Sequence, residues 1–136
     1  MRVQASTSDM ESIWDETKLL FMPSIWCEAW GLTILEAQIR GIPVIASNAG
    51  AIPESKLNVP YIIPVEEITG ERSEKGAIVL DQDLRRWVEA LKILMNDENE
   101  YERISERSRE VTTKWVQDLN PEEQEKWLLD MMTSWH

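Results

Sequence analysis

The chain has 136 residues, 43% of them hydrophobic, which is enough to bury one core and favours a single domain. Its 14 basic and 25 acidic residues leave a formal net charge of −11, which would repel a phosphate backbone, so we expect no nucleic-acid partner. With one Cys and one His the chain offers neither a disulfide framework nor a Cys/His zinc site, and no segment approaches the roughly 20 apolar residues that span a bilayer.

Short apolar runs in the first part of the chain are predicted to form buried strands, at residues 2–4, 19–22, 43–46 and 61–63. Helical patterns lie between the first three of these runs. Strands that alternate with helices predict a parallel sheet covered on both faces, which is the doubly wound α/β class. We therefore expect a partial sheet of this class, with about four strands.

Two helices are predicted between these strands. Ser8 and Glu11 form a capping-box pattern at the start of the first helix. In the second helix Leu32, Leu35 and Ile39 are spaced to share one side, which is expected to face the sheet. Gly41 suits the left-handed conformation that ends such a helix.

After residue 80 the strand patterns cease and three amphipathic helices are predicted. Residues 1–80 are thus the α/β part of one domain and residues 81–136 its helical part. The first two helices carry apolar positions at three- and four-residue steps: Leu84, Trp87, Val88, Leu91, Leu94 and Met95, then Tyr101, Ile104, Ser108, Val111 and Trp115.

The third helix is predicted to begin with Asn120 as its cap and Pro121 in its first turn. Its apolar stripe consists of Trp127, Leu128, Met131, Met132 and Trp135. Such a stripe marks an interface, so we expect the chain to self-associate through this C-terminal helix. The polar stretch at residues 66–76 is predicted to be a loop.

The loop at residues 23–31 is the predicted ligand site. Ligands of doubly wound sheets bind beyond the carboxyl ends of the strands, and this loop leaves one strand and enters a helix at about Leu32. Backbone amides at Ala29, Trp30, Gly31 and Leu32 would then lie free at a helix N-terminus, which suits phosphate oxygens. Gly31 would let the backbone approach the ligand closely.

Two carboxylates flank this loop. Glu36 lies one helical turn beyond Leu32 and can reach the same crevice, where a carboxylate suits the two hydroxyls of a ribose. Glu28 precedes the helix. The simpler interpretation is that both acids are solvated surface groups, as most charged residues are. We favour the ligand-site interpretation because of their joint context.

The stretch "PSIWCEAWGLTILEA" resembles the signature loop of family-4 glycosyltransferases of the GT-B fold, in which two Glu residues separated by seven others form the EX7E motif. Glu28 and Glu36 match that spacing. The resemblance continues through "GIPVIASNAGAIPE" and more loosely to the terminal helices. It implies that the chain is the later part of a Rossmann-like, C-terminal nucleotide-sugar-binding domain.

The resemblance also implies a function, transfer of a sugar from a nucleotide-sugar donor with retention of anomeric configuration. In that family the residue matching Glu28 contacts the donor sugar near its anomeric centre and acts in catalysis, and the residue matching Glu36 holds the donor ribose. The loop amides between them hold the diphosphate, and no metal cofactor is expected. The chain departs from the family at Ala29 and Trp30, where Gly-Phe is usual.

The N-terminal acceptor domain of the family, and the Arg and Lys that usually neutralise the diphosphate, lie outside the region of resemblance. We therefore expect a partner, supplied by the intact protein or by another chain, and no sugar transfer by this chain alone. The alternative function is a non-catalytic interaction module of the same ancestry, acting through its Trp- and Met-rich C-terminal helix. The single Cys and the lack of a signal-peptide pattern predict a cytoplasmic protein.

Overall fold

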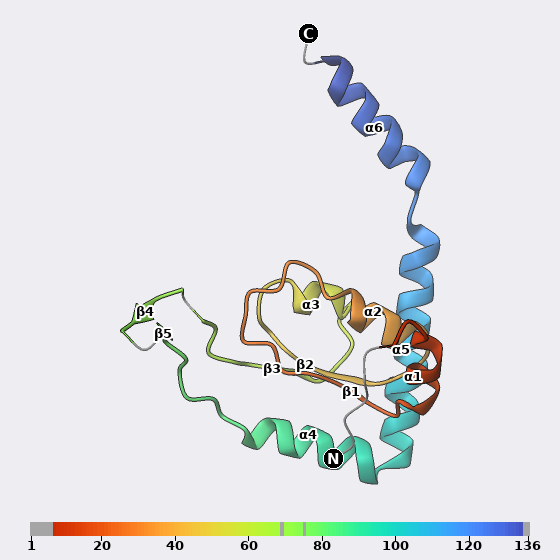
Figure 1. Ribbon diagram of the computed structural model, residues 1–136. Coiled ribbons are helices and arrows are strands. Elements are labelled where there is room, and N and C mark those ends of the chain that lie inside the picture. The colour runs from red at the N-terminus through yellow and green to blue at the C-terminus, as the bar shows by residue number, and fades with distance from the viewer. Residues whose placement is uncertain (1–6, 69, 75, 135–136) are drawn as a thin grey trace.

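The computed structural model describes residues 7–68, 70–74 and 76–134, and shows a parallel sheet with helices on both faces (Figure 1). The sheet contains β1 (Leu20–Met22), β2 (Val44–Ser47) and β3 (Ile62–Ile63), in the order β1-β2-β3. Leu20 lies opposite Val44, and Ala46 lies opposite Ile62. The predicted α/β class is confirmed, while the strand expected at residues 2–4 lies outside the described residues.

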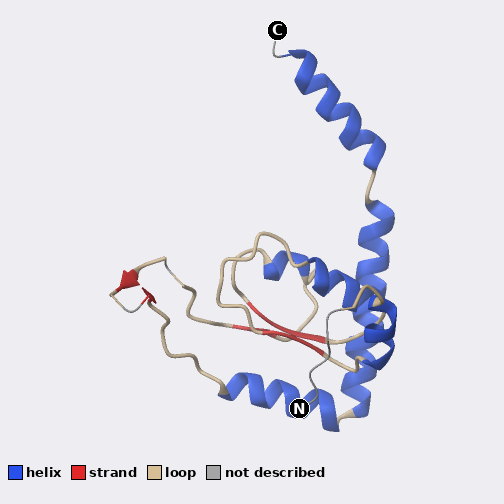
Figure 2. Ribbon diagram, viewed as in Figure 1, coloured by secondary structure: helices blue, strands red, loops and turns tan. Residues whose placement is uncertain are grey.

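Helices α2 (Leu32–Ile39) and α3 (Ile52–Ser55) cover one face of the sheet, and α4 (Arg85–Asn96) covers the other (Figure 1, Figure 2). The remaining helices are α1 (Met10–Glu16), α5 (Glu98–Asp118) and α6 (Pro121–Ser134). Helix α5 packs along α2, and α6 stands clear of the rest of the molecule.

Strand β2 is the centre of the core, because all four of its residues are buried. Val44 and Ala46 pack with Ile34 of α2 on one face, and Ile45 packs with Trp87 of α4 on the other. This alternation follows from the two-residue period of a strand. A strand apolar on both sides is the pattern expected of a parallel sheet with two covered faces.

The cap of α1 differs from the prediction. The N-cap residue is Asp9, whose side chain accepts a hydrogen bond from the Ser12 amide at 3.2 Å, so the predicted box between Ser8 and Glu11 is wrong. An Asp at this position satisfies the same kind of orphan amide that a Ser would have satisfied.

The buried face of α2 also differs from the prediction. Leu35 is buried as expected, but Leu32 is 63% exposed and Ile39 is 37% exposed. The other buried residues of the helix are Ile34, Ala37 and Gln38. The buried face is turned because α2 lies between the sheet and α5, so two neighbours rather than one decide which side is covered. Gly41 has φ of +73°, which confirms the predicted left-handed end.

Helices α4 and α6 expose many of their predicted apolar positions. On α4, Trp87 and Leu94 are buried, whereas Leu84, Val88, Leu91 and Met95 are exposed. On α6 the Asn120 side chain accepts a hydrogen bond from the Glu123 amide at 3.2 Å, which confirms the predicted cap. Trp127 is 59% exposed and Met132 71% exposed, while the Leu128 side chain and Trp135 lie outside what the structure describes.

The segment predicted to be a loop at residues 66–76 contains part of a short antiparallel pair, β4 (Arg72–Ser73) with β5 (Gly76–Ala77). This hairpin projects from the body on the side away from α5 (Figure 1). The strands were not predicted because the segment is polar and each strand has only two residues. Among the described residues, no helix is long and apolar enough to cross a membrane.

Lys56 is fully buried directly after α3, which its sequence context did not reveal. Its Nζ donates a hydrogen bond of 2.5 Å to the Val44 carbonyl oxygen. Burial lowers the pKa of Lys56 to about 7, because a low-dielectric core disfavours the ammonium form. In the unfolded chain the amine keeps a pKa near 10.5, so the unfolded state binds more protons between these two values.

Lys56→Met should therefore remove a pH dependence of stability. In the wild-type protein the free energy of unfolding should rise by about 2 kcal/mol between pH 7 and pH 9, since Lys56 opposes folding less as the unfolded chain loses its proton. Lys56→Met should be more stable at pH 7 and should lack this increment. Urea unfolding at both pH values measures the effect, with the exposed Lys92→Met as control. An unchanged pH dependence in Lys56→Met would contradict the burial argument.

Candidate functional site

The loop at residues 23–31 leaves the carboxyl end of β1 and enters α2. In a parallel sheet the turn that follows β2 emerges at the same edge, and here the two segments are joined directly. The Glu28 carbonyl oxygen accepts a hydrogen bond of 2.8 Å from the Ala51 amide. The structure thus holds the backbone of Glu28 against the turn between β2 and α3.

Gly50 is the residue that permits this contact. Its φ is +55°, and a Cβ atom placed on it would lie 2.4 Å from both the nitrogen and the carbonyl oxygen of Glu28. Its own amide donates to Glu67 Oε1 at 3.1 Å. Glu67 follows β3, and the next residue, Ile68, donates its amide to the Ile25 carbonyl oxygen at 2.9 Å. Three segments therefore meet at the loop.

The carboxylates of Glu28 and Glu36 carry no ion pair or hydrogen bond within the described part of the chain. Glu28 is half-buried in the loop, and Glu36 is exposed on α2. Outside the helix ladder, the Glu36 backbone oxygen accepts a hydrogen bond from Arg40 Nη1 at 2.9 Å. Both carboxylates are thus free to accept hydrogen bonds from a ligand.

Three of the four backbone amides predicted to be free are free within the described part of the chain. The Leu32 amide donates to the Trp30 carbonyl oxygen at 3.2 Å, so it is not free as expected. The amides of Ala29, Trp30 and Gly31 have no acceptor among the described residues. Gly31 is the N-cap of α2 and has no side chain to cap the helix, so the positive end of the helix dipole is left for another group.

Gly31 also serves packing, a role that its sequence context did not indicate. A Cβ atom on it would lie 2.8 Å from Ile34 Cδ1 and 2.9 Å from Ser55 Oγ. The residue thus admits α3 close to the start of α2. Nearby, Cys27 is an exposed free thiol and Trp26 is largely exposed.

No group of three or more His, Cys, Asp or Glu side chains is placed to hold a metal ion in the described ranges. The loop therefore offers a ligand hydrogen-bond donors from the backbone and two carboxylates. Such a set suits a molecule with an anionic part and a hydroxyl-bearing part.

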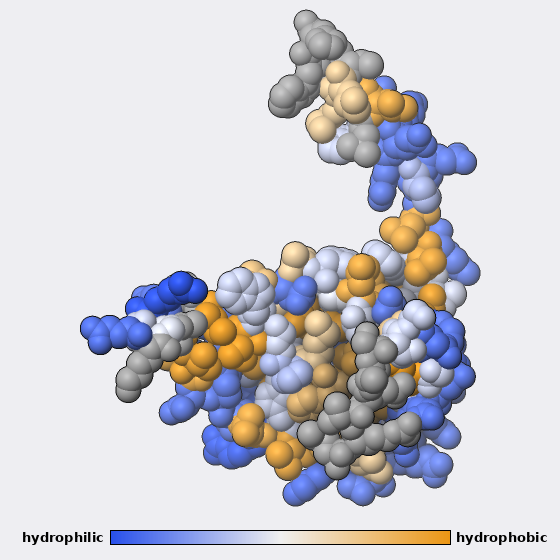
Figure 3. All heavy atoms as spheres, viewed as in Figure 1, coloured by the Kyte–Doolittle hydropathy of each residue, from blue (hydrophilic) through white to orange (hydrophobic). Residues whose placement is uncertain are grey.

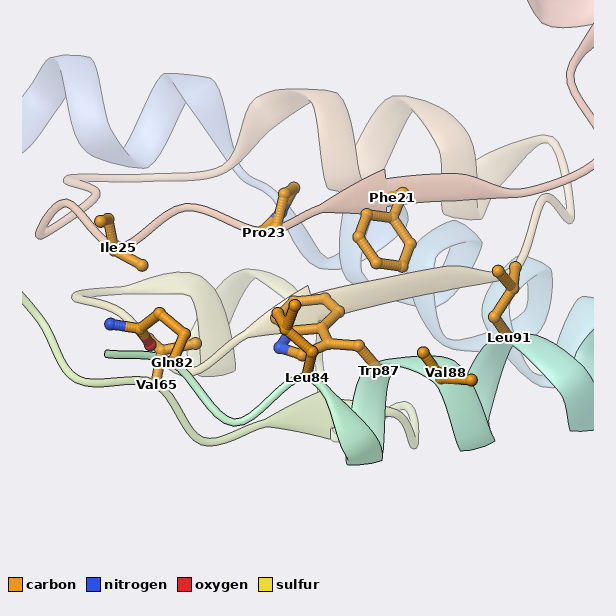
Figure 4. A pocket seen from close by; sticks show the side chains of 9 residues that line it. All are labelled: Phe21, Pro23, Ile25, Val65, Gln82, Leu84, Trp87, Val88 and Leu91. Carbon is orange, nitrogen blue, oxygen red and sulfur yellow. The ribbon is translucent and has the colours of Figure 1, made fainter. Parts of the chain in front are cut away.

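A separate apolar groove of about 310 Å³ lies between β1 and α4 (Figure 4). Phe21 and Trp87 meet in it with ring centroids 4.8 Å apart. Its lining residues are Phe21, Pro23, Ile25, Val65, Gln82, Leu84, Trp87, Val88 and Leu91. The Gln82 amide is occupied, since it accepts from the Glu66 amide at 3.0 Å and donates to the Glu66 carbonyl oxygen at 2.9 Å. The groove holds no titratable side chain and offers no acid–base chemistry.

A parallel sheet with helices on both faces, in which the loop after β1 lies at the carboxyl edge, defines a partial Rossmann-like α/β fold. The family model described as "Glycosyl transferases group 1" matches residues 3–111, which is most of the chain. The chain therefore belongs to the group 1 glycosyl transferases.

Several curated proteins are similar over part of this segment. The lipopolysaccharide core biosynthesis mannosyltransferase LpsB of Rhizobium meliloti is 35% identical over 79 residues, 58% of this chain and 19% of the relative. The sulfoquinovosyl transferase SQD2 of Arabidopsis thaliana is 33% identical over 88 residues, 65% of this chain and 15% of the relative. The D-inositol 3-phosphate glycosyltransferase of Corynebacterium kroppenstedtii is 30% identical over 91 residues, 67% of this chain and 17% of the relative. The matched segment thus spans less than a fifth of each relative.

Gly50→Ala should displace the Glu28 backbone, since the new methyl group has no space beside it. Strain from a positive φ costs about 1–2 kcal/mol, and the clash should add about 1–3 kcal/mol. The matched control is Gly70→Ala, because Gly70 has φ of +82° but nothing within 4 Å of its Cβ position. Urea unfolding should show the larger loss for Gly50→Ala, with faster hydrogen exchange at the Ala51 amide. Equal losses in both variants would show that the contact with Glu28 is unimportant.

Proposed function

We propose that this chain is the donor-binding part of a retaining glycosyltransferase that uses a nucleotide sugar. The observation that carries the proposal is the loop from Glu28 to Gly31, held by the Ala51 amide at the carboxyl edge of the sheet, with free amides and two free carboxylates. Family membership and the names of three relatives support sugar transfer. Two of those names specify different sugar groups, mannosyl and sulfoquinovosyl, so the proposal extends to nucleotide sugars as a class.

The roles follow from where charge develops. Cleavage of the bond between the anomeric carbon and the phosphate leaves positive charge on the sugar and negative charge on the diphosphate. The amides of Ala29, Trp30 and Gly31, with the N-terminus of α2 behind them, would stabilise the diphosphate, and Leu32 would flank it. Glu28 would stabilise the cationic sugar or orient one of its hydroxyls.

Glu36 would accept hydrogen bonds from the two ribose hydroxyls of the donor. In this arrangement the protein itself supplies the charge stabilisation, so the proposal includes no metal cofactor. An exposed free thiol, Cys27, fits a reducing compartment, and we place the protein in the cytoplasm as part of the same proposal.

The groove beside β1 indicates how the rest of such an enzyme would join. Among the described strands β1 pairs only with β2, so its other edge has no partner in that part of the chain. The crossover from β1 to β2 runs through α2 on one face of the sheet. A strand added at the other edge of β1 would extend the sheet in the opposite direction from β2. Because crossovers are right-handed, its helix would lie on the opposite face from α2, which is the face of α4 and the groove. We infer that the groove is covered by an upstream strand and helix of a longer polypeptide.

This arrangement would make β1 the point at which the strand order reverses. Ligands of doubly wound sheets bind at that point, and the loop from Glu28 to Gly31 leaves β1 there. The relatives carry far more polypeptide than the matched segment, which fits an acceptor domain supplied outside it. Alone, the chain should transfer no sugar.

Glu36→Ala and Glu28→Gln should impair an active enzyme that contains this segment in different ways. Ribose changes little during the reaction, so loss of Glu36 should mainly raise KM. The loss of donor-binding free energy should be about 1.5–3 kcal/mol, the value of a hydrogen bond to a charged group. Charge at the anomeric carbon appears only as the bond breaks, so Glu28→Gln should mainly lower kcat. Steady-state kinetics with the exposed Glu89→Gln as control measures both effects. Unchanged kinetics in both variants would refute the assignment of the loop.

Nucleotide binding by the isolated chain separates the proposal from its alternative. Titration with UDP, GDP or ADP at millimolar concentration, followed by backbone NMR, should shift the amides of Ala29, Trp30 and Gly31. The exposed apolar residues of α6 favour the alternative, an interaction module without catalytic function. A folded chain in which no nucleotide shifts these amides would support that module.

Self-association through α6 is a further prediction. Trp127 and Met132 are exposed on a helix that stands clear of the body, where Figure 3 shows apolar atoms open to solvent. Burying such residues against a second copy is favourable. Light scattering at high protein concentration should show a dimer or larger species for the wild-type chain and a monomer for Trp127→Ser with Met132→Ser. The groove variant Val88→Ser should still associate; a monomer in that variant would place the interface at α4 instead.

A further inference from the structure

Two tryptophans join the donor loop to α5. The rings of Trp30, in the loop, and Trp115, on α5, are stacked with centroids 6.1 Å apart and planes inclined by 30°. Trp30 directly precedes Gly31, the N-cap of α2, and its carbonyl oxygen accepts the Leu32 amide. The ring pair is thus attached to the loop at Trp30, one of the three residues whose amides are free. Trp115 lies beyond residue 111, where the match to the family model ends.

The position of α5 does not depend on this ring pair. Arg109 Nη2 donates to the Arg40 carbonyl oxygen at 3.2 Å, at the end of α2. Further along, Gln38 Nε2 donates to Thr112 Oγ1 at 3.1 Å in a buried contact. As the residue numbers rise along α5 they fall along α2, so Trp115 is delivered to the N-terminal end of α2. Helix packing therefore places the Trp115 ring, which can act as a fixed support.

The loop has few other supports between Glu28 and α2. The Glu28 carbonyl oxygen is bonded to the Ala51 amide. Further on, the Leu32 amide donates to the Trp30 carbonyl oxygen at 3.2 Å and the Ile34 amide to the Gly31 carbonyl oxygen at 2.9 Å, but these two bonds join the loop only to the start of α2. Ala29 has only a methyl side chain, and it is exposed. Of residues 29 and 30, only Trp30 has a large side chain, and its ring is stacked on Trp115 of α5.

We propose that Trp115 is a positioning residue for donor binding, which acts through Trp30 to fix the amides of Ala29, Trp30 and Gly31. The inference rests on the proposed function for its ligand, a nucleoside diphosphate. A stacked pair of this kind contributes about 0.5–1.5 kcal/mol, which corresponds to about 2- to 12-fold in an equilibrium constant. Loss of the pair should therefore loosen the loop without unfolding the chain.

The test compares Trp115→Ala and Trp115→Phe with the wild-type chain. The matched control is Val116→Ala, the next residue on α5, which is exposed. Backbone order parameters of residues 29–31 should fall from about 0.85 to below about 0.6 in Trp115→Ala and should recover in Trp115→Phe. Affinity for UDP or GDP should weaken about 2- to 12-fold in Trp115→Ala only. Order parameters of β2 should not change.

A double-mutant cycle tests the route through Trp30. In a Trp30→Ala background, Trp115→Ala should have no further effect on the order parameters of residues 29 and 31. Unchanged order in Trp115→Ala, or an equal loss of order in β2, would overturn the proposal. If the wild-type chain binds no nucleotide while Trp115→Ala still loosens the loop, the proposed function fails and the positioning of the loop stands.

Discussion

The parallel pairing of β1 with β2 is the constraint on which the rest of the structure depends. Parallel neighbours require a crossover, and the crossover through α2 brings the loop after β1 and the turn after β2 to one edge of the sheet. That shared edge lets the Ala51 amide donate to the Glu28 carbonyl oxygen and places Gly50 directly against the Glu28 backbone. The loop is therefore shaped by backbone contacts, which leave the carboxylates of Glu28 and Glu36 available.

Helix α5 packs beside the candidate site and along α2. At its start, Tyr101 Oη donates to the Lys18 carbonyl oxygen at 2.8 Å, which ties α5 to the segment before β1. In its second half it packs on α2 through the buried bond between Gln38 and Thr112, while Gln38 Oε1 and Ser108 Oγ have no hydrogen-bond partner among the described residues. These unsatisfied buried groups cost free energy. Sliding α5 along α2 would cost more, because it would break the hydrogen bond between Gln38 and Thr112 as well. The packing therefore favours one register.

The two faces of the sheet differ in how completely they are covered. Helices α2 and α3 bury their face, whereas α4 leaves Phe21, Val88 and Leu91 in an open apolar groove (Figure 4). A parallel sheet normally has both faces covered. The uncovered part lies beside β1, which pairs with β2 alone among the described strands.

Local patterns in the sequence determined the elements and the candidate loop. Short apolar runs located the three strands of the described sheet, and the helical period located five of the helices. Gly41 and Asn120 marked helix ends, and the spacing of Glu28 and Glu36 indicated the candidate loop. These patterns depend on contacts between residues close in sequence, so they can be recognised without the tertiary structure.

Only the tertiary structure decided which partners these elements meet. It buried Gln38 rather than Ile39 on α2, placed Lys56 in the core, brought Glu67 to Gly50 and stacked Trp115 on Trp30. The residues of the last two contacts are far apart in sequence, and periodicity says which side of a helix is apolar but not how many neighbours will cover it. Such contacts exist only when the sheet and its helices pack together, because packing sets the distances between remote side chains.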